Sequence, residues 1–446
     1  MESNHKNKTI LQLHELSCNI CKVLFFILLF LIEGCTDECN QQCLEKNLDC
    51  NCCPNIDTVN VTNDSVSINS INVFIETSGS MKGYMPNNNE EQTNFQTLIP
   101  EILLRLRGEV KKTNLYSIFD SKSTFKKLDI DSARKNIITK GKFAWSGSTY
   151  IPIMLDSMNN YMNKESVNIL ISDCIYSPEK KDLGITAQTI SEIREKFNKI
   201  SKDYSTVIYS LHSEYFYSKT KSVSSPYYLI LQGKSENIKI VDKMLKNSFK
   251  IFDQEYGEVH FGEKYSIPFY TILPYSENSG NNISVSCPSR ENSILIMKEI
   301  EFSTKDTLNF VIGIDLKEFP VYSNSKDYLE NNLVLSLNGQ EFKKFKVLIK
   351  DELISKIKSD DKILFEKCTH FIYVSISELK SNLSELNVSM KFSDPNWIKL
   401  LNNPEMDDNR EKTYGLENML KGIEEAYGIS ENSYFFKNLN LILIKK

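Results

Sequence analysis

The chain has 446 residues, of which 41% are hydrophobic and 25% charged, a composition typical of two or three folded domains rather than of a disordered chain. Its net charge is −5, from 53 Lys and Arg against 58 Asp and Glu, so no excess of positive charge indicates a nucleic-acid partner. The five histidines have none of the spacings of a zinc-binding motif.

An export signal is predicted at the N-terminus. Residues 23–32 form an unbroken apolar run that follows three lysines, has the length of a signal-peptide core and is short for a bilayer span. The run ends in IEGC, which resembles the lipobox at which bacterial lipoproteins are cleaved and acylated, with a glutamate that departs from the strict consensus. The acylated residue would be Cys35, and residues 1–35 would be the signal peptide. A plain signal peptide or a short uncleaved anchor is the alternative.

Acidic residues follow the predicted lipobox. Asp37 and Glu38 resemble the signal that directs some bacterial lipoproteins to the outer surface. We therefore expect an extracytoplasmic, membrane-anchored lipoprotein, at the outer membrane or the cell surface.

Five cysteines cluster between the lipobox and the first predicted strand: Cys39, Cys43, Cys50, Cys52 and Cys53. After an export signal, such a cluster is typical of disulfide bonds, and the odd count leaves one cysteine free or paired with another chain. A zinc knuckle is the alternative, but no histidine accompanies the cluster. Residues 36–66, which continue into a stretch rich in Asn, Asp, Thr and Ser, are predicted to form a tether. The isolated Cys174, Cys287 and Cys368 are predicted to be buried as small hydrophobic residues.

From residue 67 the pattern alternates between strands and helices. Mostly apolar runs predict strands at 71–75, 114–119, 167–171, 207–211 and 227–231, with a further edge strand at 123–128. Helical spacing of apolar residues predicts helices over 95–106, 150–161, 190–200 and 238–249, with a kink or restart at Pro100 and an N-cap at Ser235. We expect an α/β domain over 67–250, with a doubly wound, mostly parallel, Rossmann-like sheet. Such sheets bind ligands at the carboxyl ends of their strands.

The pattern changes near residue 250. Partly alternating runs predict strands at 308–314, 333–337, 371–376 and 386–392, separated by polar loops. A helix over 416–427, closed by Gly428, and a strand over 438–444 end the chain. Residues 251–446 are therefore predicted to form a β-rich, sandwich-like domain with a C-terminal helix.

Polar side chains stand where two of the buried strands end. Glu76, Ser78 and Ser80 follow the strand at 71–75, and Asp173 follows the strand at 167–171. Between them, Thr149 lies in a Ser/Gly-rich loop before a predicted helix.

This arrangement resembles the von Willebrand factor type A (vWA) family over roughly residues 67–249. That family carries Asp-x-Ser-x-Ser after its first strand, a Thr in a later loop and an Asp after its fourth strand, which together form the metal-ion-dependent adhesion site (MIDAS). On this resemblance Ser78 and Ser80 match the serines, Thr149 the threonine and Asp173 the aspartate, while Glu76 stands where the family has Asp.

The resemblance implies a Mg²⁺ site in which the hydroxyl groups bind the ion directly and the carboxylates act mainly through water. Neutral ligands leave the ion under-neutralised, so it would attract a carboxylate from a protein partner into its open position. The extra methylene of Glu76 moves its carboxylate outward by about 1.5 Å, a shift that Mg²⁺ tolerates poorly. Binding of Mn²⁺ or Ca²⁺, or a fold that retains a degenerate site, are the alternatives.

Other polar segments are weaker candidates. Residues 82–86 (KGYMP) are predicted to be a solvated loop, or alternatively to shape ligand specificity. Trp145 is predicted either as an exposed contact or as buried under its loop, and His212 as a structural residue. Asp407 and its acidic neighbours lack the spacing of a calcium-binding loop and are predicted to be solvated.

The chain contains no G-x-S-x-G, H-E-x-x-H or Walker motif. We therefore expect a non-enzymatic binding or assembly protein that uses its metal site to bind an acidic group of a partner protein. The alternatives are an enzyme or enzyme subunit with chemistry in residues 251–446, and a scaffold with a degenerate metal site.

Overall fold

The structure is a computed structural model that describes residues 68–86, 92–118, 124–139, 147, 149–175, 185–217, 222–273, 284–286, 295–300, 307–354, 356, 361–405 and 407–445. Val61–Val285 and Met297–Lys446 form one compact unit. The other unit, Met1–Asn60 with Ser286–Ile296, is described only at residues 286, 295 and 296. The predicted lipidation site Cys35 and the cysteine cluster at 39–53 lie outside the described residues.

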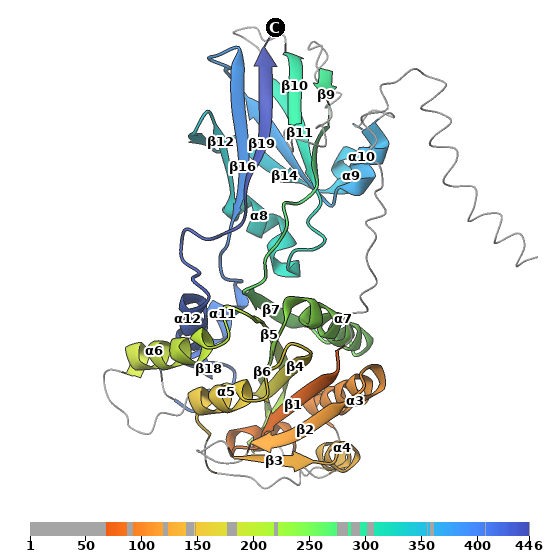
Figure 1. Cartoon of the computed structure of the whole chain (residues 1–446), viewed down its shortest axis with the longest axis vertical. Coiled ribbons are helices and arrows are strands. Elements are labelled where there is room, and N and C mark those ends of the chain that lie inside the picture. The colour runs from red at the N-terminus through yellow and green to blue at the C-terminus, as the bar shows by residue number, and fades with distance from the viewer. Residues whose placement is uncertain are drawn as a thin grey trace, which may run out of the picture. The chain divides into compact units, whose positions relative to one another are not determined.

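A seven-stranded sheet organises the first half of the chain, in the order β3-β2-β1-β4-β6-β5-β7 (Figure 1). Its strands are β1 (Ser70–Glu76), β2 (Thr113–Ile118), β3 (Phe125–Leu128), β4 (Ser166–Ser172), β5 (Ser205–Phe216), β6 (Ser222–Gly233) and β7 (Tyr256–Phe261). All six strands predicted between residues 67 and 250 are present, and the predicted edge strand, β3, lies at one edge.

The sheet is mixed, which corrects the prediction of a mostly parallel one. Only β1 with β2 and β1 with β4 are parallel, whereas the other four neighbouring pairs are antiparallel. One cause is the connection between β5 and β6, which is too short to hold a crossover helix, so that these two strands form a hairpin. The mixed sheet keeps a parallel centre, where β2, β1 and β4 end at the same edge.

Helices cover both faces of the sheet (Figure 1). The apolar sides of α3 (Asn94–Glu109), α4 (Ile130–Thr139) and α7 (Ser235–Ile251) share one core with one face of the sheet. The opposite face packs against α5 (Ile151–Asn159) and α6 (Ile185–Asn198). Val73 points into the first core and Phe74 into the second, as the alternation of a strand buried on both faces requires.

Three features of the helices differ from the sequence predictions. α3 passes through Pro100 as one helix, which begins at a capping box formed by Thr93 and Gln96. α7 begins at Ser235, but its N-cap is Lys234, which makes no capping bond with its side chain. The helix α4 was not predicted.

The second half of the chain contains two further large sheets, and the six strand pairs whose register is described in them are antiparallel. One has the order β13-β12-β16-β19-β10-β9, formed by Gln340–Phe342, Leu333–Leu337, Leu383–Lys391, Tyr434–Lys445, Leu295–Ile300 and Ser284–Ser286. The other has the order β14-β15-β11-β8, formed by Phe345–Leu348, His370–Ile376, Leu308–Ile314 and Tyr270–Leu273. Short helices connect these strands: η3 (Val321–Asn324), α8 (Lys326–Asn332), α9 (Lys350–Leu353) and α10 (Lys362–Lys367). The molecule is thus mixed α/β with a β-rich second half.

The chain returns from the β-rich half to the first sheet between residues 397 and 427. There it forms α11 (Trp397–Leu401), the short parallel strands β17 (Asn402–Asn403) and β18 (Thr413–Tyr414), and α12 (Leu416–Ala426). α12 matches the predicted helix, and Gly428 follows it with φ +70°, as expected of a C′ residue. The buried side of α12 packs against Ile193 and Phe197 of α6, so the layer that covers the α/β sheet includes a helix from near the C-terminus.

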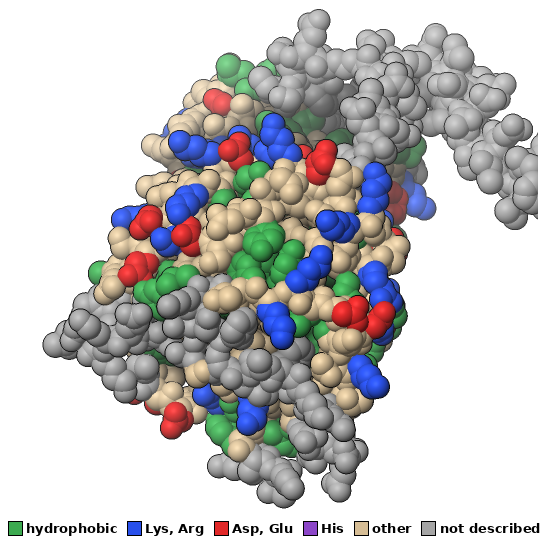
Figure 2. Space-filling model, turned by 60° about the horizontal axis from the view of Figure 1, so that its bottom comes forward, with side chains coloured by type: hydrophobic (Ala, Val, Ile, Leu, Met, Phe, Trp, Pro, Cys, Tyr) green, Lys and Arg blue, Asp and Glu red, His purple; other side chains and the backbone are tan. Residues whose placement is uncertain are grey.

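The described surface is mixed in charge: Lys and Arg side chains are interspersed with Asp and Glu on the face drawn in Figure 2. Among the described residues, none of the helices combines the length and the apolar composition needed to cross a membrane.

Gly422→Ala tests the contact between α12 and α6. A Cβ at Gly422 would lie 2.7 Å from the backbone oxygen of Ile190 and 2.8 Å from Cβ of Ile193, so α12 would have to shift. We expect a loss of about 1–3 kcal/mol in the free energy of unfolding, although alanine favours a helix by about 1 kcal/mol over glycine. Denaturant titration measures the effect.

Gly108→Ala in α3 is the matched control, because nothing lies within 4 Å of its added Cβ. This change should leave stability equal or raise it by up to about 1 kcal/mol. Equal stabilisation by both changes would contradict the close packing of α12 on α6.

Candidate functional site

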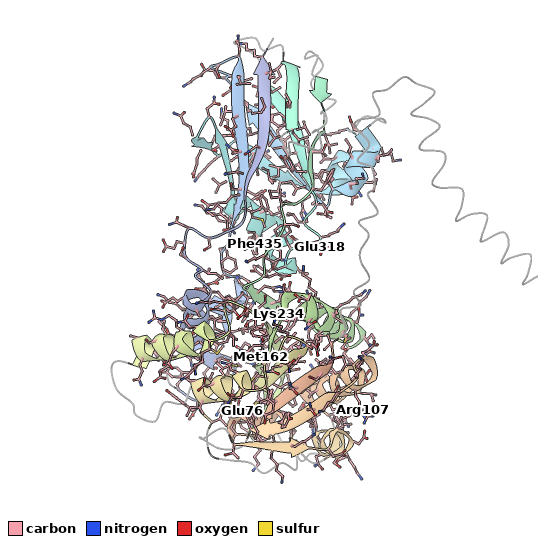
Figure 3. The ribbon with its side chains drawn as sticks, in the orientation of Figure 1. Glu76, Arg107, Met162, Lys234, Glu318 and Phe435 are labelled. Atoms are coloured by element: carbon pink, nitrogen blue, oxygen red, sulfur yellow. The ribbon has the colours of Figure 1, made fainter. Side chains whose placement is uncertain are left out.

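The parallel pair β1 and β4 places two acidic residues at one edge of the sheet. Glu76 is the last residue of β1, and Asp173 follows Ser172, the last residue of β4. The strands pair in register up to Ile75 and Ile171, so the next residues, Glu76 and Ser172, end the two strands side by side. Figure 3 marks Glu76 at the end of β1.

A chain of hydrogen bonds joins the five predicted site residues. One carboxylate oxygen of Glu76 accepts a hydrogen bond from the Thr149 hydroxyl. Ser78 also hydrogen-bonds to Glu76, and its Oγ lies 2.8 Å from Oγ of Ser80. Ser80 in turn hydrogen-bonds to the Asp173 carboxylate. The structure therefore brings all five side chains together.

A sixth residue, Ser172, belongs to the same group, and the sequence analysis missed it. Its hydroxyl donates to the second carboxylate oxygen of Glu76 and accepts a hydrogen bond of 2.8 Å from the backbone N–H of Cys174. The longer side chain of Glu76 thus reaches across to β4. The available signal was the position of Ser172 in sequence, as a hydroxyl residue between a buried apolar strand and an acid.

The site is buried, and this changes its charge. Glu76 is 3% exposed and Asp173 is 2% exposed. Burial, and then the charge of Asp173, raise the pKa of Glu76 from 4.5 to about 7. Burial also raises the pKa of Asp173, against the hydrogen bond from Ser80 and the nearby charge of Arg410. Near neutral pH the pair therefore holds a proton on Glu76 for part of the time.

The backbone turns sharply after Asp173. Cys174 has φ +51°, a left-handed conformation that is unfavourable for a residue with a side chain. The turn lets the N–H of Ile175 donate to Oδ1 of Asp173 at 3.2 Å, while Oδ2 is buried and has no hydrogen-bond partner. Cys174 is a buried free thiol, as predicted, and so is Cys368, whereas Cys287 lies outside the described residues.

The donor set at this edge suits a hard cation. Its side chains present two carboxylates and several hydroxyl groups, and these oxygen ligands are the kind that Mg²⁺, Mn²⁺ and Ca²⁺ prefer. The unpaired Oδ2 of Asp173 is an acceptor for which the hydrogen-bond network supplies no donor. Ser78, Ser80 and Thr149 would hold the ion directly, with Asp173 and Glu76 beside them.

The segment after Ser80 is part of the core, which corrects the prediction of a solvated loop at 82–86. It forms the short helix η2 (Ser80–Tyr84), in which Tyr84 is 1% exposed. The Tyr84 hydroxyl lies 2.7 Å from Oγ of Ser225 and donates to the backbone oxygen of Pro226 at 2.6 Å. Lys82 alone is exposed between buried neighbours. Trp145 lies outside the described residues.

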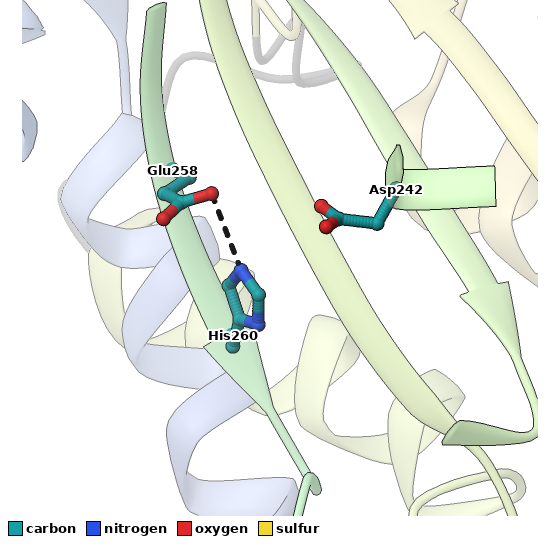
Figure 4. A group of neighbouring side chains, drawn as sticks. All are labelled: Asp242, Glu258 and His260. Carbon is teal, nitrogen blue, oxygen red and sulfur yellow. Dashed lines mark ion pairs between the residues drawn. The ribbon is translucent and has the colours of Figure 1, made fainter. Parts of the chain in front are cut away.

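A second group of ionisable side chains lies at β7, an edge strand of the sheet, where Asp242 of α7 faces Glu258 and His260 of β7 (Figure 4). Their ligand atoms lie within 4.8 Å of one another, a spacing compatible with a metal. However, Nζ of Lys246 lies 2.8 Å from Oε2 of Glu258 and 3.2 Å from Oδ2 of Asp242. The ammonium group thus stands where a cation would bind.

His260 is also in the wrong protonation state for a metal ligand. Burial lowers the pKa of its imidazole, but hydrogen bonds and charges from Glu258 and Glu263 outweigh burial and raise it to about 9. A protonated imidazole has no lone pair for a metal. Glu258 in addition accepts a hydrogen bond of 2.5 Å from the N–H of Val321. The ion pair of Glu258 with Lys246 therefore connects β7 to α7, and this hydrogen bond connects β7 to η3. We interpret it as structural.

His212 lies within β5 rather than at its end, and it is half-buried. Burial lowers the pKa of its imidazole, which favours the neutral form. It lines a cavity of about 610 Å³ together with Tyr256, Tyr322 and Trp397. The residues that line this cavity do not include those at the ends of β1 and β4.

Comparison of the chain with protein-family models, curated proteins and solved structures found no match.

The pKa of Glu76 predicts how stability depends on pH in the absence of divalent cations. In the unfolded chain this carboxyl ionises near 4.5, whereas in the folded protein it keeps its proton to about 7. The folded state therefore loses stability as pH rises from about 4.5 to about 7. Glu76→Gln removes this dependence, so from pH 5 to pH 8 wild type should lose about 2–3 kcal/mol relative to the variant.

Denaturant titrations at both pH values in a chelator measure this difference. Glu109→Gln, which changes an exposed glutamate at the end of α3, is the control and should follow wild type. A constant difference between wild type and Glu76→Gln across this range would contradict the raised pKa.

Proposed function

We propose that the α/β half of this protein is a vWA-like domain that binds a divalent cation, Mg²⁺ first and Mn²⁺ or Ca²⁺ as alternatives, at the ends of β1 and β4. Through this ion it would bind an acidic group of a partner protein. The support is the hydrogen-bonded chain Thr149–Glu76–Ser78–Ser80–Asp173, which joins residues from three separate segments.

The parallel centre of the sheet is consistent with this proposal. β2, β1 and β4 run in the same direction, helices lie on both faces, and the polar residues follow the carboxyl ends of β1 and β4. Ligand sites of α/β sheets lie at such ends. The sandwich-like arrangement of the second half stays a prediction.

The chemistry favours binding over catalysis. Ser78 and Ser80 hydrogen-bond to each other and to the carboxylates, and the interactions described for the site include no histidine that would activate either hydroxyl. The carboxylates are buried, so a divalent ion would displace the proton of Glu76 and gain strong interactions in a medium of low dielectric constant. Hydroxyl ligands are neutral, so an ion that they bind retains positive charge that would attract a carboxylate of a partner protein.

A scaffold with a degenerate site is the second candidate, and one observation favours it. Both carboxylate oxygens of Glu76 already accept hydrogen bonds from Thr149 and Ser172, so the protonated site is nearly closed without an ion. Cation titration separates the two candidates.

Asp173→Ala should abolish divalent-cation binding and leave the fold intact, because it removes an acidic ligand and little core volume. Glu76→Asp should tighten Mg²⁺ binding by about tenfold relative to Mn²⁺ and Ca²⁺, because the shorter side chain withdraws the carboxylate from Ser172 toward the position usual in the family. Isothermal titration calorimetry with each cation on wild type and both variants measures this.

Asp156→Ala, which removes a partly exposed carboxylate from α5, is the control and should bind as wild type does. If wild type, Glu76→Asp and the control all fail to bind any of the three cations, the scaffold interpretation is the correct one.

We further propose that the protein acts outside the cytoplasm, anchored by a lipid at Cys35, as the apolar run and the lipobox-like IEGC suggest. Cys35→Ala should move the protein from the membrane fraction to the soluble fraction or block its processing. Cys39→Ala, four residues later, is the matched control and should stay in the membrane. Unchanged partition and unchanged gel mobility of Cys35→Ala would rule out lipidation.

A further inference from the structure

A segment from near the C-terminus reaches the proposed cation site. Residues 404–412 connect β17 to β18, and β18 begins at Thr413, whose Oγ1 donates to the backbone oxygen of Asp173 at 3.5 Å. Oγ1 of Thr413 in turn accepts a hydrogen bond of 2.9 Å from the hydroxyl of Tyr228 in β6. The segment therefore begins and ends on the α/β half, next to the acid that follows β4.

Arg410 of this segment directs its charge at the site. Its Nη1 lies 4.0 Å from Oδ2 of Asp173, the carboxylate oxygen that is buried without a hydrogen-bond partner. The guanidinium also lies over the ring of Tyr215, 5.2 Å from its centroid, and the side chain is 24% exposed. An arginine keeps its charge at any pH that the fold tolerates, so Asp173 has a permanent positive neighbour.

The contacts of Arg410 are loose compared with those that hold the two ends of the segment. At 4.0 Å the guanidinium makes no hydrogen bond to Asp173, and its contact with Tyr215 is through the ring face. Within the segment, Oδ1 of Asp407 accepts from the N–H of Asn409, and Oδ1 of Asn409 accepts from the N–H of Glu411.

We propose that Arg410 is an internal cation that competes with the divalent ion for Asp173, so that ion binding displaces Arg410 and releases residues 404–412 from the site. This inference rests on the proposed function, because it needs a divalent ion at Asp173. An ion that contacts Oδ2 would lie within a few ångströms of the guanidinium, with little solvent to screen the repulsion. The guanidinium therefore has to move away from the ion.

The displaced segment would also change the rim of the site. It carries Glu405, Asp408, Glu411 and Lys412 at the surface, and removal of Arg410 from Tyr215 would open the approach to the ion. A partner's carboxylate would then reach the ion without passing the folded segment. Affinity for the ion and access for the partner would thus be coupled through one side chain.

The test compares Mn²⁺ binding to the full folded protein and three variants, by calorimetry and by the electron paramagnetic resonance signal of free Mn²⁺. Arg410→Gln should bind Mn²⁺ about tenfold more tightly than wild type, because the competing charge is gone. Arg410→Lys keeps the charge and should stay within about threefold of wild type. Lys412→Gln removes the same charge from an exposed position two residues away and should also stay near wild type.

Amide hydrogen exchange provides a second measurement on wild type. Saturating Mn²⁺ should speed exchange within residues 404–412 and leave α12 unchanged. Arg410→Gln should show the faster exchange without the ion.

The outcomes separate this inference from the proposed function. Equal or weaker Mn²⁺ binding by Arg410→Gln, equal tightening by Lys412→Gln, or slower exchange in 404–412 on addition of Mn²⁺ would overturn the competition and leave cation binding standing. Absence of binding by all four proteins would overturn both.

Discussion

Two carboxylates buried at the ends of neighbouring parallel strands are the feature on which the rest of the site depends. Glu76 and Asp173 are almost inaccessible to solvent, and burying charged groups costs more free energy than isolated interactions return. The protein offsets this cost with hydroxyl donors such as Ser172, with a proton on Glu76, and with the charge of Arg410. The arrangement requires that β1 and β4 end at the same edge, which only their parallel pairing ensures.

The sequence predicted this centre because its strands are buried on both faces. The runs INVFI and VNILI are nearly continuous in apolar residues, so β1 and β4 could be located, and with them the acids that follow. The apolar runs could not predict the order and direction of the outer strands. Strand pairing is not local in sequence, and the apolar pattern of β5 and β6 is the same whether they form a hairpin or two crossover units. The decisive clue was the short interval between these strands, which has no room for a helix.

The members of the site that sequence reasoning missed show where such reasoning stops. Ser172 is adjacent to Asp173, but strand periodicity does not reveal that its hydroxyl points at Glu76. Arg410 lies in a polar stretch far along the chain. The packing of α12 on α6 and the hydrogen bonds of Thr413 bring this stretch back to the sheet. The segment at 82–86 was misjudged because Lys82, Gly83 and Pro86 are typical of loops, whereas Tyr84 binds the segment to the core.

The charge balance at the two edges of the sheet explains why one group of acids is a plausible cation site and the other is not. Around β7, the three carboxylates of Asp242, Glu258 and Glu263 meet three positive groups, Lys246, the protonated His260 and Lys239. Adding a metal there would require expelling a cation that is already well placed. Around β1 and β4, two carboxylates face one guanidinium, which lies 4.0 Å from Asp173. The second negative charge is neutralised by a proton on Glu76, whose pKa is about 7. A proton with a pKa near 7 is readily displaced by a divalent ion. The ion carries one more positive charge than the proton, so the site would then hold an excess of one positive charge. That excess would repel Arg410 and attract an external carboxylate.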